Sequence, residues 1–270
     1  MKSAKKNAKT ASANSALLVV KIGSGLLTNN NGGIDQVQIE NICRQIVALK
    51  LSGHEVAVVS SGAISSGMTM LELKKRPADL CMLQACATLG QPRLMQAYET
   101  AFNHFQLHAA QILVTSWDLD SRKMRQNLQA TVRCLLDLKN CVPVFNENDA
   151  LSFEEIEMLN RFGDNDQLSA HVALLLGASR LIILSGIEGL KTRADGGGKL
   201  VRRVTTIDER IESYAGRSRS EHSVGGMISK LKTARLMLQH GVPMVIANGR
   251  EPDVLLKIAR GERVGTWFEK

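Results

Sequence analysis

Short apolar runs alternate along this chain with longer segments in which apolar residues recur every three or four positions. A short run rich in β-branched residues is typical of a strand buried on both faces, and the longer pattern is typical of an amphipathic helix. This order predicts an α/β fold with a mostly parallel sheet covered by helices on both faces. The predicted strands cover residues 17–22, 55–60, 110–115, 142–145, 181–184, 244–247 and 265–268, and the predicted helices cover 80–106, 121–139, 168–176 and 227–240 together with a segment that begins after Asp35.

Two polar segments carry local signals. Asp35-x-x-Gln38 has the spacing of a capping box, which predicts a helix that starts there and ends before Gly53. Residues 191–204 include three consecutive glycines and many charges, which predicts an exposed hairpin or loop. No segment rich in proline and serine divides the chain, so we expect a single domain from residue 16 to residue 270.

The composition is that of a globular protein with a full core, since 44% of the 270 residues are hydrophobic and 22% are charged. The formal net charge is +8. Residues 1–15 contain Lys2, Lys5, Lys6 and Lys9 but no acid, and we expect them to form a disordered basic tail. The remaining excess charge is spread out, so we expect no nucleic-acid partner; a substrate with phosphates or carboxylates accounts for it equally well.

Cysteine usage and hydropathy bear on location. The chain has five cysteines, an odd number, and no C-x-x-C motif, so neither a zinc site nor a disulfide framework is indicated. A reducing, cytoplasmic setting is the prediction. No apolar run approaches the roughly 20 residues that a membrane helix needs, so we expect no membrane association.

Polar residues and glycines follow several of the predicted strands. Because the carboxyl ends of parallel strands meet along one edge of a sheet, we expect these residues to lie together and form a ligand site. They are Lys21, Gly23 and Ser24 after the first strand, Ser60 to Ala63 after the second, Asn146 to Asp149, and Ser185 with Gly186.

Lys21 stands at the end of a strand that the pattern predicts to be buried. A buried lysine needs an anionic partner, because an unpaired buried charge is costly. The partner is either a neighbouring acid, in a structural ion pair, or the phosphate oxygens of a phosphoryl-transfer reaction. Ser61-Gly62-Ala63-Ile64 opens a predicted helix, whose first N–H groups could hold a carboxylate or a phosphate.

Two further segments lie at the starts of predicted helices. Phe162-Gly163-Asp164-Asn165-Asp166 has more acid and amide groups than one helix cap needs, and such a cluster could orient lysines, bind an ammonium group or hold magnesium. Gly225-Gly226-Met227-Ile228-Ser229-Lys230 puts a lysine in a first helical turn, where its charge opposes the helix dipole. Both a solvated lysine and a lysine facing a bound anion are compatible with that position.

Two common nucleotide motifs are absent. Gly198-Lys199 is followed by Leu200 rather than by a hydroxyl residue, so there is no P-loop. Residues 23–28 keep only two glycines of the dinucleotide fingerprint, and the second predicted strand ends without the acid that a nicotinamide enzyme uses. The sequence therefore disfavours a dehydrogenase.

Six motifs together resemble the amino acid kinase family, and within it the branch that phosphorylates glutamate. The resemblance covers residues 17–268 and implies a three-layer αβα sandwich. It implies transfer of the γ-phosphoryl group of ATP to the side-chain carboxylate of L-glutamate, which gives glutamyl 5-phosphate in the first step of proline biosynthesis. The motifs are residues 19–24 (VVKIGS), 60–64 (SSGAI), 144–150 (VFNENDA), 162–166 (FGDND), 225–230 (GGMISK) and 264–266 (VGT).

The same resemblance implies roles for individual residues. Lys21, Lys230 and Asp166 match the catalytic positions, with Asp166 holding the two lysines in place. The matching glutamate-binding positions are Ser61, Gly62, Ala63, Asp149, Asp164 and Asn165, and the nucleotide-binding positions are Lys21, Gly23, Ser185, Gly186, Gly225, Gly226, Met227 and Lys230. No side-chain metal site is implied, since Mg²⁺ would be held mainly by the ATP phosphates and water.

The resemblance further implies L-proline as a feedback inhibitor and a homo-oligomer, either a dimer or a tetramer. It implies a kinase domain without the C-terminal RNA-modification-type domain that many relatives carry. The family has Thr-Asp where this chain has Ser185-Gly186, and Gly-Thr-Gly-Gly at residues 223–226. These differences lie on the nucleotide side. They leave open a non-catalytic glutamate- or proline-sensing homologue, besides a kinase of another small carboxylic acid.

Overall fold

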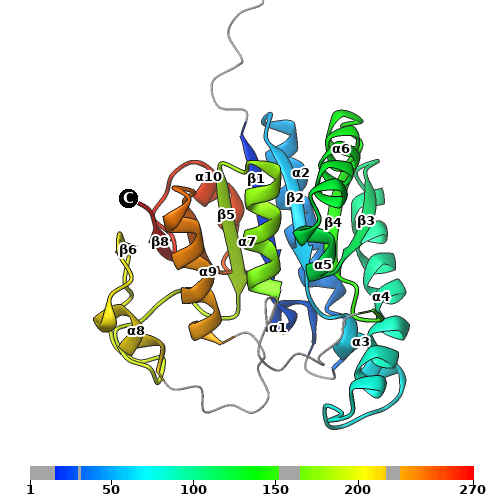
Figure 1. Ribbon diagram of the computed structural model, residues 1–270, viewed down its shortest axis with the longest axis horizontal. Helices are drawn as coiled ribbons and strands as arrows, with labels where there is room; N and C mark the ends of the chain where they lie inside the picture. Colours follow the sequence, from blue (N-terminus) through cyan, green and yellow to red (C-terminus); the bar gives the residue numbers. More distant parts are fainter. Residues whose placement is uncertain (1–15, 30–31, 152–164, 217–225) are drawn as a thin grey trace, which may run out of the picture.

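The computed structural model describes residues 16–29, 32–151, 165–216 and 226–270. They build one eight-stranded sheet with the strand order β3-β4-β2-β1-β5-β7-β8-β6 (Figure 1). Every neighbouring pair is parallel except β7 and β8. The strands are β1 Leu17–Ile22, β2 Glu55–Ser60, β3 His108–Val114, β4 Cys141–Glu147, β5 Arg180–Ser185, β6 Arg203–Val204, β7 Met244–Asn248 and β8 Thr266–Phe268.

Helices cover both faces of this sheet, and each face has its own apolar core. The predicted three-layer αβα sandwich with a mostly parallel sheet is therefore confirmed. One core is covered by α1 Ser24–Leu27, α2 Gln36–Leu51, α3 Ala63–Met70, α4 Leu80–Asn103 and α10 Val254–Ala259. The other is covered by α5 Ser116–Asp120, α6 Arg122–Asp137, α7 Asn165–Leu176, α8 Glu209–Ala215 and α9 Met227–Gln239.

Side chains of β1 alternate between the two cores, as strand geometry requires. Val20 and Ile22 pack into the core beneath α2, whereas Val19 packs into the core beneath α7 and α9. Lys21 has the same parity as Val19, so its side chain emerges on the α7 and α9 side.

Two neighbouring strands, β1 and β5, mark the point where the connections change face. The connection after β1 leads to α2 on one face, whereas the connection after β5 leads to α9 on the other. Ligands of open α/β sheets bind outside the carboxyl ends of strands at such a point. A backbone hydrogen bond of 3.0 Å from Gly23 N to Leu184 O ties the ends of these two strands together.

Two local predictions need correction. Asp35 caps α2 by accepting from Gln38 N at 3.1 Å, but the Gln38 side chain does not complete a capping box and instead donates to Gly249 O at 2.7 Å. The box is wrong because a buried carbonyl competes for that amide. Residues 191–204 do form a hairpin-like turn, bridged between Lys191 and Leu200, but their end, β6, joins the sheet beside β8.

Helices α3 and α4 approach so closely that only glycine fits at two contacts. A Cβ atom on Gly90 would overlap the carbonyl oxygen of Ala63, and one on Gly67 would overlap that of Cys86. The first residue of α3 is therefore held in backbone contact with α4. Within the described ranges, no helix is both long and apolar enough to cross a membrane. The predicted basic tail, residues 1–15, lies outside the described residues.

Candidate active site

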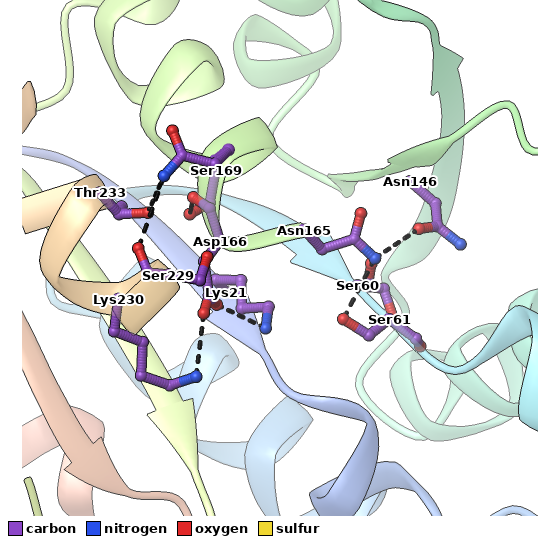
Figure 2. Close-up of polar contacts among 11 residues, drawn as sticks. Lys21, Ser60, Ser61, Asn146, Asn165, Asp166, Ser169, Ser229, Lys230 and Thr233 are labelled. Carbon is purple, nitrogen blue, oxygen red and sulfur yellow. Dashed lines mark hydrogen bonds and ion pairs between the residues drawn. The ribbon is translucent and has the colours of Figure 1, made fainter. Parts of the chain in front are cut away.

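Asp166 lies between two lysines from different parts of the chain (Figure 2). Lys21 Nζ, at the end of β1, is 2.6 Å from Asp166 Oδ1, and Lys230 Nζ, in the first turn of α9, is 2.9 Å from Oδ2. Each carboxylate oxygen thus faces its own ammonium group. The structure brings together the three residues that the resemblance implies to be catalytic.

This cluster is buried: Lys21 and Lys230 are each 5% exposed and Asp166 is 0% exposed. Burial by itself would raise the pKa of the Asp166 carboxyl, but the charges and hydrogen bonds of Lys21 and Lys230 outweigh it and hold that pKa below its ordinary value. With Asp166 ionised, the three side chains carry a net charge of one positive. A buried excess of positive charge favours an anionic ligand.

Three helices begin around this cluster, and helix N-termini attract anions. Asp166 lies in the first turn of α7, where the helix dipole favours its charge. α3 and α9 both begin after glycines, Gly62 and Gly226, which have no side chain to cap the first N–H groups. Gly62 has a φ of 101°, a left-handed conformation that glycine adopts without strain.

Asn165 connects α7 to the ends of two strands through its amide. Its Nδ2 donates to Ser60 O at 2.9 Å, to Ser61 Oγ at 3.1 Å and to Asn146 Oδ1 at 3.1 Å (Figure 2). The Oδ1 atom of Asn165 is buried and has no hydrogen-bond partner among the described residues. Such an orphaned acceptor suits a donor group of a ligand.

Asp149 follows β4 by two residues, at the same edge of the sheet. Burial raises the pKa of this carboxyl to about 6, even though the charge of Arg76 acts to lower it. A partly desolvated carboxyl of this kind gains most from a cationic partner.

Of the predicted nucleotide-binding residues, Gly23 lies beside Lys21, whereas the other described ones lie at the end of β5 or at the start of α9. A Cβ atom on Gly23 would come within 3.9 Å of Lys21 Nζ, and the glycines at 186 and 226 face open space. The hydroxyl of Ser185 is buried without a hydrogen-bond partner in the described part of the chain. Met227 is the first residue of α9. Asp164 and Gly225 lie outside the described residues.

The sequence placed Asn146 among the polar residues of the expected ligand site but assigned it no role, and it gave no indication of Gln91. Asn146 Nδ2 donates to Gln91 Oε1 at 2.8 Å, and Gln91 Nε2 donates to Gln111 Oε1 at 2.9 Å. A glutamine in the apolar pattern of a long helix gives no local signal of such a role. In the described segments, no group of three His, Cys, Asp or Glu side chains is placed to hold a metal ion.

The model of the amino acid kinase family matches residues 16–248, so the chain belongs to that family. It is 47% identical over 252 residues to the glutamate 5-kinase of Nitrosospira multiformis, covering 92% of this chain and 66% of that protein. It is 40% identical to the glutamate 5-kinase of Clostridium perfringens, covering 93% of this chain and 94% of that protein.

A glutamate 5-kinase of Thermus thermophilus is 44% identical and is covered over 66% of its length. This chain thus spans about two thirds of several relatives and nearly all of the one from Clostridium perfringens. Among solved structures, UMP kinase from Bacillus anthracis superposes with a TM-score of 0.61 at 18% identity, covering 94% of this chain and 96% of that one. That likeness concerns the fold.

Proposed function

We propose that this chain is an ATP-dependent kinase of L-glutamate and that Lys21, Asp166 and Lys230 form its phosphoryl-transfer centre. The observation that carries the proposal is the buried cluster in which one carboxylate holds two ammonium groups at 2.6 and 2.9 Å. Kinship with glutamate 5-kinases at 40–47% identity supports the acceptor and the donor.

The reaction joins an oxygen of the glutamate side-chain carboxylate to the γ-phosphorus of ATP. The bond between that phosphorus and the bridging oxygen to the β-phosphate breaks, and ADP leaves with the electron pair. A carboxylate is already ionised at neutral pH, so no general base has to remove a proton. The chain has only to position the two reactants and neutralise charge on the transferring group.

The lysines do this from two sides. Lys21 is the last residue but one of β1 and lies close to Gly23, where the chain leaves the sheet, and Lys230 projects from the first turn of α9. We assign Lys21 to the transferring phosphoryl group and Lys230, with the first N–H groups of α9, to the nucleotide phosphates. Asp166 keeps both ammonium groups aimed at one place and offsets their mutual repulsion.

The amino acid would lie toward β2 and β4. The N–H groups that open α3, after Gly62, and the hydroxyl of Ser61 suit a carboxylate. Asn165 Oδ1 and the carboxylate of Asp149 suit the α-ammonium group, since both are acceptors that gain from a donor. Asp164, which we also assign to this pocket, lies outside the described residues.

The nucleotide phosphates bring their own cation in this proposal. Mg²⁺ held mainly by phosphate oxygens and water would shield the charge that accumulates during transfer. Ser185, with its orphaned hydroxyl, and Gly186, with open space beside it, border the place where the rest of the nucleotide would extend.

The proposal carries expectations about inhibition, oligomeric state and location. L-proline carries the same α-carboxylate and a cationic amine, so it would compete with glutamate for the groups around Asn165 and Asp149. A dimer or tetramer and a cytoplasmic location stay predictions from the resemblance.

The test is release of ADP by the purified protein with MgATP across a panel of acceptors: L-glutamate, N-acetylglutamate, L-aspartate, carbamate and UMP. We expect turnover with L-glutamate alone at millimolar concentrations and below, and hydroxylamine should convert the product to a hydroxamate. Turnover with UMP or carbamate but not glutamate would overturn the acceptor assignment. Binding of glutamate or proline without turnover would favour a sensor.

A further inference from the structure

A chain of side-chain amides leads from the amino-acid pocket into α4. Asn165 Nδ2 donates to Asn146 Oδ1 at 3.1 Å, Asn146 Nδ2 donates to Gln91 Oε1 at 2.8 Å, and Gln91 Nε2 donates to Gln111 Oε1 at 2.9 Å. Asn146 is 2% exposed and Gln91 is 9% exposed. Gln111, on the edge strand β3, is exposed. This row of hydrogen-bonded amides therefore has a buried end at the amino-acid pocket and an exposed end at the surface.

Backbone groups fix the direction of this chain at its buried end. Asn146 Oδ1 accepts from the N–H of Glu147 at 3.0 Å, and Asn165 Nδ2 donates to the carbonyl of Ser60 at 2.9 Å. A backbone N–H only donates and a carbonyl only accepts. Rotating either side-chain amide by half a turn would therefore place a donor against a donor or an acceptor against an acceptor. Asn146 must then present its NH₂ group to α4.

Gln91 supplies the one acceptor that the NH₂ group of Asn146 meets in the described residues. Its place on α4 is set by the backbone: the neighbouring Gly90 brings α4 against Ala63, at the start of α3. A buried donor left without an acceptor is destabilising, so Asn146 would shift to find one if the Gln91 side-chain oxygen were removed. Any shift of Asn146 acts on Asn165, whose Oδ1 is the orphaned acceptor of the pocket.

We propose that Gln91 is a positioning residue for the amino-acid pocket: its Oε1 orients Asn146, and through it Asn165, so that the pocket is formed before substrate arrives. Gln91 itself touches no reacting group. This inference rests on the proposed function, because it assigns Asn165 to the bound glutamate. It concerns the amino-acid side only and leaves the Lys21, Asp166 and Lys230 cluster untouched.

The test compares substitutions on one helix. Gln91→Met keeps the length of the side chain but removes the acceptor, and it should raise the KM for L-glutamate by about 5- to 20-fold, the worth of roughly one hydrogen bond. The KM for ATP and kcat should stay within about twofold, because the phosphoryl-transfer centre is unchanged. Gln91→Glu keeps an acceptor for Asn146 while the exposed Gln111 can rotate to donate, so its KM should remain within about threefold of the original.

Gln96→Met is the matched control, since Gln96 lies on the exposed side of the same helix and should tolerate the change with no kinetic effect. Should Gln91→Met fail to fold, Gln91→Asn stays polar but is too short to reach Asn146, and the same rise in KM is expected. Calorimetric binding of L-glutamate to each folded variant reports the pocket without turnover.

Two failures are distinguishable in this design. An unaltered chain that neither binds nor phosphorylates L-glutamate contradicts the proposed function. The role of Gln91 alone is overturned if the unaltered chain phosphorylates glutamate but the Gln91 variants leave the KM for L-glutamate unchanged. It is also overturned if these variants lower kcat without a selective rise in that KM.

Discussion

Lys21 Nζ, near the end of β1, lies 2.6 Å from Oδ1 of Asp166, near the start of α7, although the two residues are 145 positions apart in the sequence. The second oxygen of the same carboxylate holds Lys230. Neither lysine is close to Asp166 in the sequence, so the three side chains meet only because the fold brings their elements together at one edge of the sheet. The parallel register of β1 with β5 and the docking of α7 and α9 over the same core bring the three charges together.

Loss of Lys230 should lower turnover without unfolding the chain. Lys230→Met keeps the aliphatic stem but removes the charge, and one lost contact of this kind typically lowers kcat by about 10²–10³-fold. Steady-state kinetics with MgATP and L-glutamate measures it. Lys232→Met, two residues further along α9 and exposed, is the control and should retain full activity. An unchanged kcat in Lys230→Met would contradict a role for Lys230 in phosphoryl transfer.

Neutralising Asp166 should destabilise the fold more than removing a lysine. Asp166→Asn leaves two buried ammonium groups facing each other, and breaking a buried ion pair in this way costs about 3–5 kcal/mol. Adding Lys230→Met to Asp166→Asn relieves the repulsion, so the double variant should be more stable than Asp166→Asn alone. Urea denaturation of the three variants tests this. A double variant less stable than both single ones would contradict the electrostatic account.

Acid should release the stabilisation that Asp166 provides. The folded-state pKa of Asp166 lies below its ordinary value of 3.8, so the unfolded chain takes up the proton first as the pH falls. The contribution is complete above that value and is lost as the pH drops below it. Denaturation at stepped pH values should show a smaller acid-induced loss in Asp166→Asn than in the unaltered chain. Equal losses would show that other groups govern acid unfolding.

Glutamate affinity should weaken as the pH falls through about 6, the raised pKa of the Asp149 carboxyl. Only the ionised form attracts an ammonium group, so binding must drive off the proton at and below that pH. Calorimetry in two buffers of different ionisation enthalpy should detect proton release at pH 6. Asp149→Asn should weaken binding at pH 8 and abolish the proton release. A proton release that persists in Asp149→Asn would locate the titrating group elsewhere.

The contact between α3 and α4 should be intolerant of one added methyl group. A Cβ on Gly90 would overlap the backbone oxygen of Ala63, so Gly90→Ala must push α3 and its opening N–H groups away. We expect a loss of stability of about 1–3 kcal/mol, typical of overpacking, together with a raised KM for glutamate. Thr88→Ala on the exposed face of α4 is the control. A stable Gly90→Ala enzyme with an unchanged KM for glutamate would show that the contact between α3 and α4 does not determine the shape of the amino-acid pocket.

Seven strands, the mostly parallel character of their sheet and the longer helices could be predicted from the sequence, because buried strands and amphipathic helices leave a periodic pattern of apolar residues. The short helices α1, α5, α8 and α10 were not predicted. The cluster at the sheet edge could be predicted in part. Lys21 stood out because a lysine rarely ends a buried strand, and Asp166 because its segment had more carboxylates than a cap needs.

Other features had no local signal. Gln91 belongs to the site network only because α4 packs beside β4, and a buried glutamine looks the same in sequence as an exposed one. Gln38 was predicted to cap its own helix, yet it donates to Gly249, which lies 211 positions away. The edge strand β6 is two residues long, too short for any periodicity. Long-range polar contacts of this kind depend on the assembled fold.

One measurement tests the central claim most directly: formation of glutamyl hydroxamate from MgATP, L-glutamate and hydroxylamine by the unaltered chain and by Lys21→Met, each verified as folded by its circular dichroism and melting curve. The account predicts glutamate-dependent hydroxamate from the unaltered chain and at least about a hundredfold less from Lys21→Met. Equal hydroxamate from both proteins, or none from the unaltered chain, would contradict it.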